Sequence, residues 1–487
     1  MDNLNRNQFL TLMAGGMRAG LMPVDVDGRG PIRPGNTSQP PNILFILTDN
    51  QRADLLGCAG NPIIQTPHLD LLAQRGVRFA NAFATSPICA ASRASYLTGL
   101  YECRHQFTFK TPPLRTEFTD HSYPALLKAA GYRTGFIGKF GIESHGKLLV
   151  ENEEATLKKM FDHFDNFEHW GLFEGSPQGY FVEQAEGRKK HLTDITAEKA
   201  INFLRECQPD QPWCLSVSFN APHAQDDDPR LYIWPQSEDK LYENEIIPEA
   251  INSGPVFFQS LPKFIRESEN RVRWHSRFDT PENYQRNRKG LYRMVSGVDR
   301  NVGRIIKCLE QQSCKNNTVI LFASDHGMYY GERGLSDCWQ LNEESMRIPL
   351  IICDPRTQGG SRAAIEEMVL NIDLAPTILA LAGLPRPQNI QGQNLLPLIE
   401  GTIDDWRDEF FCEHRFDHPG MAKSEGVRTK RWKYIRYFEQ NPVYEELYDL
   451  ESDPHESQNL AGVPSAAAQL TEMRLRCTEL SQMAASN

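Results

Sequence analysis

Thr318-Val319-Ile320-Leu321-Phe322-Ala323-Ser324-Asp325-His326-Gly327 is the stretch that decides the fold. It passes from an uninterrupted apolar run directly into a carboxylate, an imidazole and a glycine. Short continuous apolar runs fit strands that are buried on both faces of a mostly parallel sheet. The stretch therefore predicts a central strand of an α/β domain, with Asp325 and His326 at its carboxyl end.

A second apolar run ends in the same way. Pro41-Asn42-Ile43-Leu44-Phe45-Ile46-Leu47-Thr48-Asp49-Asn50 places Asp49 and Asn50 directly after a predicted buried strand. Lys139 and His223 likewise follow predicted strands. Because ligands in open α/β sheets gather at the carboxyl ends of the strands, we expect all these side chains to meet at one edge of the sheet.

A cysteine lies at a predicted helix start in Ser86-Pro87-Ile88-Cys89-Ala90-Ala91-Ser92-Arg93-Ala94-Ser95-Tyr96-Leu97-Thr98-Gly99. Pro87 favours an extended entry, the alanines and serines that follow suit a helix, and Gly99 is a stop signal. Unpaired N–H groups at a helix N-terminus favour an anion near Cys89, and Arg93 falls on the same face one turn later. On these residues alone, a half-buried structural thiol is the stronger interpretation of Cys89.

The polar residues at the strand ends share a recognisable chemistry. Oxygens from Asp49, Asn50 and Asp325 are hard ligands, which suit Ca²⁺ or Mg²⁺ better than a soft metal. The cations Arg93 and Lys139 beside two carboxylates would leave a site poised to bind a tetrahedral oxyanion. The sequence therefore predicts a divalent metal and an anionic substrate at one edge of the sheet.

Composition excludes several classes of protein. The chain has 487 residues and a net charge of −11, which argues against a nucleic-acid-binding protein. Its 11 cysteines include no Cys-x-x-Cys pair, so neither a zinc ribbon nor a dense disulfide scaffold is indicated. No apolar run reaches the roughly 18 residues of a membrane-spanning helix. The sequence does not indicate an oligomeric state.

The chain divides into three parts. Residues 1–40 are expected to form a leader and linker, in which residues 5–16 resemble a weakened twin-arginine export signal. Use of that signal would place the protein in the periplasm or outside the cell, whereas a leader without targeting value would leave it in the cytoplasm. Residues 41–384 carry the α/β pattern, and residues 385–487 are expected to form a small C-terminal α+β unit with an antiparallel sheet.

Two long segments have no clear pattern. Residues 143–188 are aromatic and glycine-rich with irregular spacing, which predicts a long loop region whose aromatic side chains pack beneath it or form a sugar-stacking wall. Residues 225–288 are polar and punctuated by proline, and we expect them to pass over the active-site face. A long amphipathic helix is predicted over 291–309. The two irregular segments are expected to determine the substrate.

Motifs along most of the chain resemble those of the formylglycine-dependent sulfatases in the alkaline-phosphatase-like superfamily. The matching segments are residues 42–49, 89–99, 138–139, 221–223, 324–327, 343–350, 447–450, 453–454 and 459–461. The resemblance covers about residues 41–462 and implies a large, mostly parallel sheet flanked by helices, followed by the small C-terminal unit.

The resemblance also implies a nucleophile and a metal site. A maturase would convert Cys89 to formylglycine, whose hydrate attacks sulfur, expels the alcohol, and then releases sulfate to restore the aldehyde. The metal, Ca²⁺ or Mg²⁺, would be held by Asp49, Asn50, Asp325 and His326 together with the modified Cys89. His326 could alternatively act as a base, or it could contact the metal ligands without binding the metal itself.

The remaining catalytic roles follow from the same resemblance. His223 would protonate the leaving alkoxide, Lys139 would bridge formylglycine and sulfate, and Arg93 would fix the nucleophile. The implied reaction is hydrolysis of a sulfate ester, with a sulfated polysaccharide or oligosaccharide as the substrate class suggested by analogy.

The sequence departs from the family pattern at four places. Asn50 replaces a second aspartate, and Ala91 replaces the commoner proline two positions after the cysteine. The usual Lys-x-His is Lys139-Phe140-Gly141, which leaves His145 as a substitute for the missing histidine. Cys338 stands where a sulfate-binding lysine is expected. These departures indicate a divergent subfamily.

Two alternatives remain open. A hydrolase of phosphonates or phosphate diesters would use the same nucleophile and metal, and fewer cations would favour less charged substrates. A catalytically impaired, glycan-binding relative would also explain the departures. The retention of Cys89, Arg93, Lys139, His223 and Asp325 counts against the second alternative.

Overall fold

The computed structural model describes residues 33–34, 40–109, 112–144, 147–170, 178–358 and 364–486. Most of the expected leader over 1–40, including the export-like segment 5–16, lies outside these residues, as does His145. In the described part of the chain, no helix combines the length and the apolar composition that crossing a membrane requires.

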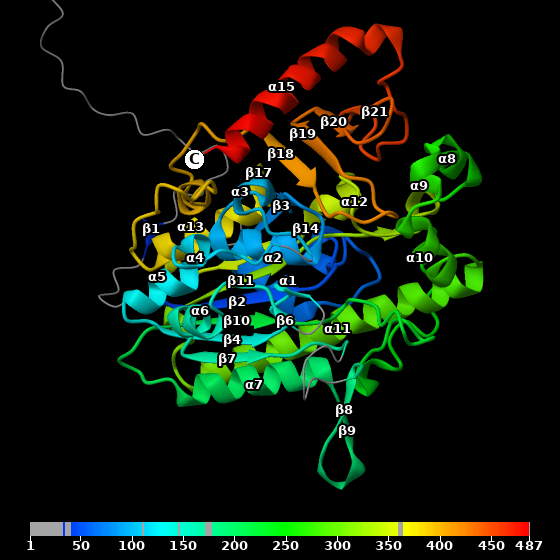
Figure 1. Ribbon diagram of the computed structural model, residues 1–487. Coiled ribbons are helices and arrows are strands. Elements are labelled where there is room, and N and C mark those ends of the chain that lie inside the picture. The colour runs from blue at the N-terminus through cyan, green and yellow to red at the C-terminus, as the bar shows by residue number, and fades with distance from the viewer. Residues whose placement is uncertain are drawn as a thin grey trace, which may run out of the picture.

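A large central sheet forms the framework of the molecule (Figure 1). Its strand order is β14 (Arg347–Ile348), β3 (Val77–Phe83), β15 (Leu350–Cys353), β11 (Thr318–Ser324), β2 (Asn42–Thr48), β10 (Trp213–Ser218), β4 (Arg133–Gly138) and β7 (His163–Asn166), with β17 (Ile365–Leu370) paired to β3. Neighbouring strands from β11 to β7 are parallel, whereas β15 is antiparallel to both its neighbours and β14 is antiparallel to β3. The predicted mostly parallel sheet is confirmed.

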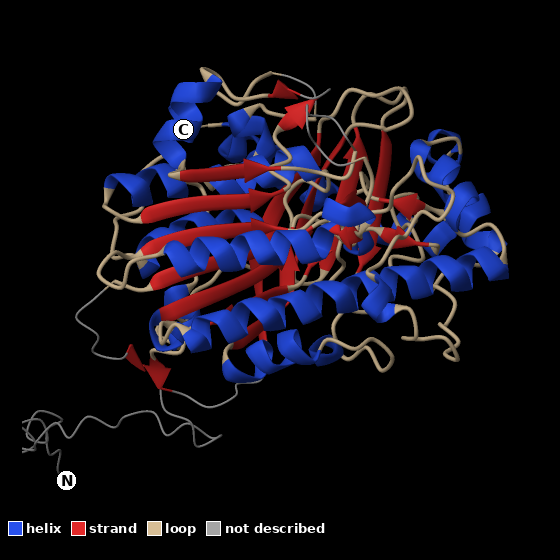
Figure 2. Cartoon of the chain, turned by 90° about the horizontal axis from the view of Figure 1, so that it is seen from below, coloured by secondary structure: helices blue, strands red, loops and turns tan. Residues whose placement is uncertain are grey.

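Helices cover both faces of this sheet. On one face, Leu44 and Ile46 of β2 share a core with α1 (Pro67–Arg75), α7 (Leu192–Glu206) and α11 (Pro281–Gln311). On the other face, Ile43 and Phe45 share a core with α2 (Cys89–Thr98), α5 (Tyr123–Ala129) and α13 (Leu374–Leu381). Figure 2 shows helices lying in front of the strands. Burial on both faces explains why β2 is apolar at consecutive positions.

A separate antiparallel sheet forms the C-terminal part, as predicted. It contains β18 (Glu409–His414), β19 (Ser424–Thr429), β20 (Trp432–Tyr437) and β21 (Tyr444–Asp449) in that order, and α15 (Ala467–Ala485) packs against it. In Figure 1 this sheet and α15 lie at the opposite end of the molecule from α7. A shared apolar cluster joins Phe83 and Met346 to Phe410 and Ile435, so the small sheet packs directly on the larger part of the chain.

The remaining elements are short. The helices are α3 (Glu102–His105), α4 (Thr116–Thr119), α6 (Glu153–Met160), α8 (Pro255–Ser260), α9 (Lys263–Arg266), α10 (Glu269–Arg277), α12 (Glu343–Met346) and α14 (Leu396–Glu400). The strands are β1 (Arg33–Pro34), β5 (Glu143–Ser144), β6 (Lys147–Leu148), β8 (Phe181–Glu183), β9 (Lys189–His191), β12 (Tyr329–Tyr330), β13 (Ser336–Asp337) and β16 (Thr357–Gln358).

Two expectations from the sequence were wrong. The segment 143–188 is not one long loop, because it contains α6 and β7, and β7 is an edge strand of the central sheet. The helix expected to begin at residue 291 begins at Pro281, where Thr280 accepts a hydrogen bond of 3.1 Å from the backbone N–H of Asn283. A proline at the first position and a threonine cap are ordinary helix-start signals.

Candidate active site

Strand ends deliver the predicted side chains to one edge of the sheet. Asp49 follows β2, Lys139 follows β4, and Asp325 follows β11. Asn50 adopts a left-handed backbone conformation with φ of 64°, which asparagine tolerates better than most residues. Its backbone N–H donates to Asp325 Oδ1 over 3.0 Å, and its carbonyl accepts from the Tyr330 hydroxyl over 3.0 Å. These hydrogen bonds connect the end of β2 to the residues that follow β11.

Cys89 is the first residue of α2 and lies among the strand-end side chains. Its Sγ is 3.3 Å from His326 Nε2, 3.7 Å from Asp49 Oδ1 and 3.9 Å from Asn50 Oδ1. Burial and the neighbouring Asp49 carboxylate raise the pKa of the Cys89 thiol well above its usual value. An unmodified Cys89 is therefore a protonated thiol and a poor nucleophile.

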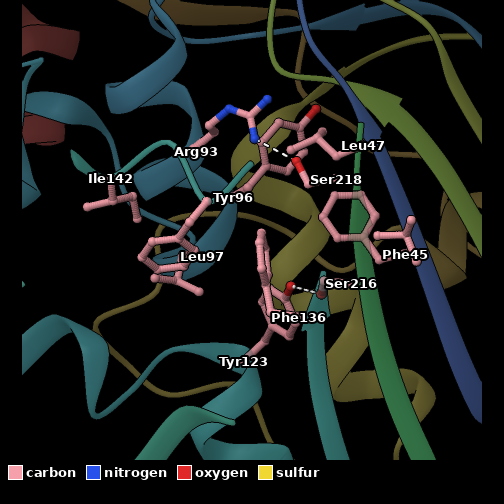
Figure 3. Close-up of a pocket in the computed structure, with 12 residues that line it drawn as sticks. Phe45, Leu47, Arg93, Tyr96, Leu97, Tyr123, Phe136, Ile142, Ser216 and Ser218 are labelled. Carbon is pink, nitrogen blue, oxygen red and sulfur yellow. Dashed lines mark hydrogen bonds between the residues drawn. The ribbon is translucent and has the colours of Figure 1, made fainter. Parts of the chain in front are cut away.

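Arg93 is held rigidly beneath the site. Its Nε donates to Asp325 Oδ2 over 2.9 Å, and one terminal nitrogen donates to the Lys139 carbonyl and to Ser218 Oγ, each over 2.7 Å. Figure 3 shows the guanidinium and Ser218 above a small, mostly apolar cavity of about 30 Å³ lined by Phe45, among others. The hydrogen bonds to Asp325, Lys139 and Ser218 together fix the orientation of the Arg93 guanidinium.

Lys139 and Asp49 form a buried ion pair. Burial alone would raise the pKa of Asp49, but Lys139, His223 and Arg93 hold it well below its usual range. Burial alone would lower the pKa of Lys139, but Asp49 raises it above its usual value. Both partners are therefore charged at neutral pH.

His326 contacts Cys89 through one ring nitrogen and the backbone through the other. Nε2 faces the thiol, and Nδ1–H donates to the Gly327 carbonyl over 2.8 Å. Burial lowers the pKa of His326, but Cys338 and Asp325 raise it above its usual value. The ring is thus oriented with Nε2 toward the nucleophile position.

His223 lies on the wall of the same cavity as Cys89 and Lys139. Its Nδ1–H donates to the Ala224 carbonyl over 2.6 Å, which leaves Nε2 to carry a reacting proton. The ring packs against His169 and Trp170, with centroid distances of 5.3 and 5.5 Å. Burial lowers the pKa of His223, so the free site holds a neutral imidazole.

A cavity of about 400 Å³ opens above Cys89. Its lining residues are Ile88, Cys89, Phe109, Lys139, Gly141, Glu168, Trp170, His223, Asp226, Glu269, Arg273, Asp337, Cys338, Trp339, Phe416, His418 and Met421. Both irregular segments reach it, as the sequence predicted, through Glu168 and Trp170 and through Asp226, Glu269 and Arg273.

Other lining residues were missed by the sequence reasoning. Phe416, His418 and Met421 come from the C-terminal part, to which the sequence assigned no role at the site. Asp337 and Trp339 have φ of 70° and 77°, a conformation that is uncommon outside glycine and is often found at functional sites. The single sequence carries no signal for the contribution of the C-terminal part.

The departures from the family pattern have structural counterparts. Cys338 lines the cavity, where a lysine would have added a charge. Gly141 has φ of +75°, and a Cβ atom there would lie 2.2 Å from Arg93 Cδ. A histidine at position 141 therefore cannot coexist with this position of Arg93, which explains why position 141 departs from the pattern while Arg93 is retained.

The donor set fits a hard divalent cation. Asp49, Cys89, Asp325 and His326 are buried, and one ligand atom of each lies within 4.8 Å of all the others. Asn50 adds an amide oxygen beside them. Two aspartate carboxylates and an amide oxygen are the ligands that Ca²⁺ and Mg²⁺ prefer.

Comparison with known proteins identifies the family of this chain. The family model for sulfatases matches residues 41–384, and the model for the C-terminal part of N-sulphoglucosamine sulphohydrolase matches residues 331–483. The chain belongs to the sulfatase family. This sulfatase is therefore a sulfuric ester hydrolase with the alkaline-phosphatase-like fold that the sequence motifs predicted.

Several relatives are similar over nearly the whole chain. This sulfatase is 28% identical to the N-acetylglucosamine-6-O-sulfatase of Bacteroides thetaiotaomicron, over 89% of this chain and 85% of the relative. It is 29% identical to an arylsulfatase of Clostridium perfringens, over 86% of this chain and 90% of the relative. A solved structure of a protein in complex with its substrate D-glucosamine-2-N,6-O-disulfate matches with a TM-score of 0.73 and 25% identity, over 92% of this chain and 98% of that one.

The fold is shared more widely than the reaction. The phosphonate monoester hydrolase of Agrobacterium radiobacter matches with a TM-score of 0.71 at 23% identity, over 91% of this chain and 96% of that one. This likeness concerns the fold alone.

Proposed function

We propose that this sulfatase hydrolyses sulfate esters of carbohydrates through formylglycine formed from Cys89. The observation that carries the proposal is the position of Cys89, at the start of α2, among Asp49, Asn50 and His326 and at the base of the large cavity. Because the unmodified thiol is a poor nucleophile here, modification by a maturase would supply the reactivity that the site lacks.

A divalent cation would be held by Asp49, Asn50, Asp325 and His326 together with the modified Cys89, and Ca²⁺ or Mg²⁺ suits these ligands. Bound there, the cation would polarise sulfate oxygens, and hydrated formylglycine would supply the oxygen nucleophile. We also propose that the catalytic domain spans residues 41–384 and that the C-terminal domain spans residues 385–487.

Three side chains of the chain itself perform the remaining steps. Arg93 holds Asp325 in place, and Lys139, paired with Asp49, presents its ammonium group to the sulfate. Sulfate binding near His223 favours its protonated form, and Nε2–H then protonates the leaving alkoxide. The alcohol departs neutral, which removes the main barrier to cleavage of an alkyl sulfate.

A carbohydrate substrate is supported by the relatives and by the cavity. One relative is an N-acetylglucosamine-6-O-sulfatase, and a solved neighbour contains a disulfated glucosamine. The cavity combines aromatic walls, Trp170 and Trp339, with polar side chains, which is the composition of a sugar-binding site.

Mass spectrometry of the peptide containing Cys89 tests the proposal. Protein produced with a formylglycine-generating maturase should show the mass loss of thiol to aldehyde at Cys89 and should release sulfate from an aryl or sugar sulfate. Cys89→Ala is the matched control and should release none. An unmodified thiol together with no sulfate release under these conditions would contradict the proposal.

One alternative reaction would use the same site. Phosphonate monoesters and phosphate diesters carry a single negative charge, as sulfate esters do, so the cavity, in which Cys338 stands where a lysine was expected, suits them equally by charge. The ratio of kcat/KM for 4-nitrophenyl sulfate to that for a 4-nitrophenyl phosphonate decides between the two reactions. A ratio well above one supports the sulfatase reaction, and a ratio well below one supports the alternative.

A further inference from the structure

We propose that Glu168 selects the alcohol portion of the substrate. It accepts a hydrogen bond from a hydroxyl or ammonium group and disfavours an alcohol that carries a second anionic group. This inference rests on the proposed hydrolysis of sulfate esters and adds to it the charge class of the molecule that bears the sulfate.

Glu168 is a buried carboxylate with unused hydrogen-bonding capacity. Only 2% of the residue is exposed, and it lines the cavity above Cys89 together with Trp170. In the described part of the chain, its buried Oε1 has no hydrogen-bond partner. A buried carboxylate oxygen without a donor costs free energy, so a donor on the substrate would supply the hydrogen bond that Oε1 lacks in the folded protein.

The catalytic cations do not account for this carboxylate. Lys139 is paired with Asp49, and Arg93 is bound to Asp325. Glu168 contributes to the raised pKa of Lys139 only after Asp49 and Cys89, so it is not the main counterion of that lysine. The negative charge of Glu168 therefore faces the cavity largely uncompensated.

Another part of the cavity wall adds to the negative charge. Asp226 and Asp337 share the guanidinium groups of Arg273 and Arg277, and Glu269 also pairs with Arg273. Two cations thus serve three carboxylates on this wall. Together with Glu168 they give the alcohol side of the cavity an excess of negative charge, which repels a further sulfate or carboxylate.

Apolar side chains complete the cavity and leave room for an uncharged ring. Trp170 and Trp339 supply flat faces, and Phe416 and Met421 supply apolar contact. Sugar rings and aryl groups both stack on such faces. The substrate class that fits is a monosulfated sugar or alcohol with hydroxyl or ammonium donors.

A series of phenyl sulfates with one variable charge tests this inference. The three probes carry an ammoniomethyl, a hydroxymethyl or a carboxylate group meta to the sulfate, and released sulfate gives kcat/KM. The wild-type enzyme should prefer the ammonium probe over the carboxylate probe by roughly tenfold or more. Glu168→Gln should reduce this preference several-fold, chiefly through KM, because it removes the charge and keeps the shape.

Two further variants make the test specific. Glu168→Asp keeps the charge and should keep the wild-type order of the probes, even where its overall activity is lower. Glu183→Gln removes one negative charge from the β8–β9 hairpin, which projects from the body of the molecule in Figure 1, and should leave all three values unchanged.

An equal effect of Glu168→Gln on all three probes would overturn the inference, as would a wild-type preference for the carboxylate probe. If the wild-type protein with modified Cys89 hydrolyses none of the probes and releases no sulfate from a sugar sulfate, the proposed function itself fails. The two failures are therefore distinguishable.

Discussion

Gly141 has a left-handed backbone conformation, and Arg93 occupies the space that a side chain at position 141 would need. Its φ is +75°, and a Cβ atom would lie 2.2 Å from Arg93 Cδ. We expect Gly141→Ala to displace Arg93 from Asp325, to lower kcat/KM by roughly tenfold or more, and to reduce the free energy of unfolding by about 1–3 kcal/mol. Steady-state kinetics and urea denaturation measure the two effects.

Gly131 provides the matched control for that substitution. Its φ is +92°, but nothing lies within 4 Å of the Cβ position. Gly131→Ala should therefore show only the backbone cost of about 1 kcal/mol and no change in kcat/KM. Equal kinetic effects of the two substitutions would show that contact with Arg93 is not the cause.

Asp325 binds three donors and is a proposed metal ligand. Arg93 Nε donates to Oδ2, and the backbone N–H groups of Asn50 and His326 donate to Oδ1. Asp325→Ala should abolish Ca²⁺ binding measured by isothermal titration calorimetry, because it removes a carboxylate ligand and the bonds that orient Asn50. A calcium titration identical to that of the wild type would refute the metal assignment.

Residues at strand ends could be predicted from the sequence, whereas residues on irregular segments could not. Asp49 and Asp325 follow apolar runs, so their position depends on the parallel sheet alone. Glu168 follows a short edge strand, and Arg273 lies on α10 within a polar segment. Their arrival at the cavity depends on how loops pack, and no local pattern encodes that.

At the scale of elements, a carboxylate from one helix caps another. Asp299 of α11 accepts hydrogen bonds from the backbone N–H groups of Leu69, over 2.7 Å, and of His68, over 3.2 Å, at the start of α1. The N-cap residue Thr66 makes no side-chain cap of its own. Asp299 therefore supplies the acceptors that the first turn of α1 needs.

Burial of Asp299 makes this cap sensitive to pH. Burial raises its pKa from 3.8 to about 7, despite the hydrogen bonds from Leu69 and His68 that lower it. The folded state thus holds a proton that the unfolded state releases, so the free energy of unfolding should fall as pH rises from about 4 to about 7. The contribution of Asp299 to this fall is at most about 4 kcal/mol.

Asp299→Asn tests this contribution. The amide cannot ionise, so the variant should match the wild type near pH 4 and exceed its stability near pH 8, as measured by urea denaturation. The same dependence of stability on pH in both proteins would contradict the assignment. Asp299→Ala, which removes the acceptors as well, should be less stable than Asp299→Asn at every pH.

Helices and strands with a strong hydrophobic pattern could be predicted from the sequence, whereas those with a weak pattern could not. The strands β2 and β11 are long enough and apolar enough to be found directly. The strand β7 has only four residues, all half-buried, and α6 lies in a segment of irregular aromatic spacing. Tertiary pairing with β4, and not local preference, makes β7 a strand.

At the scale of the whole molecule, the C-terminal sheet supports the nucleophile. The backbone N–H of Glu413 in β18 donates to the Thr85 carbonyl over 3.0 Å, and Ser86 Oγ donates to the Glu413 carbonyl over 2.9 Å. Thr85 and Ser86 lie just before Cys89 in the chain. The C-terminal part therefore both lines the cavity and fixes the segment that leads into α2.

The last prediction concerns the ion pairs that join the two parts. Lys433 of β20 is fully buried, and its Nζ lies 2.7 Å from Glu343 of α12 and 2.8 Å from Glu456. Lys433→Met keeps the length of the side chain but leaves the buried Glu456 and the half-buried Glu343 without this cation. We expect the free energy of unfolding, measured by urea denaturation, to fall by about 3–5 kcal/mol. Fluorescence and activity should be lost in one transition, because both parts share a core.

Lys158→Met is the control, because it removes only an exposed ion pair with Glu154, and it should cost less than about 1 kcal/mol. Equal losses in the two variants, or an active species that survives the unfolding of the C-terminal sheet, would show that this sheet is not coupled to the catalytic part.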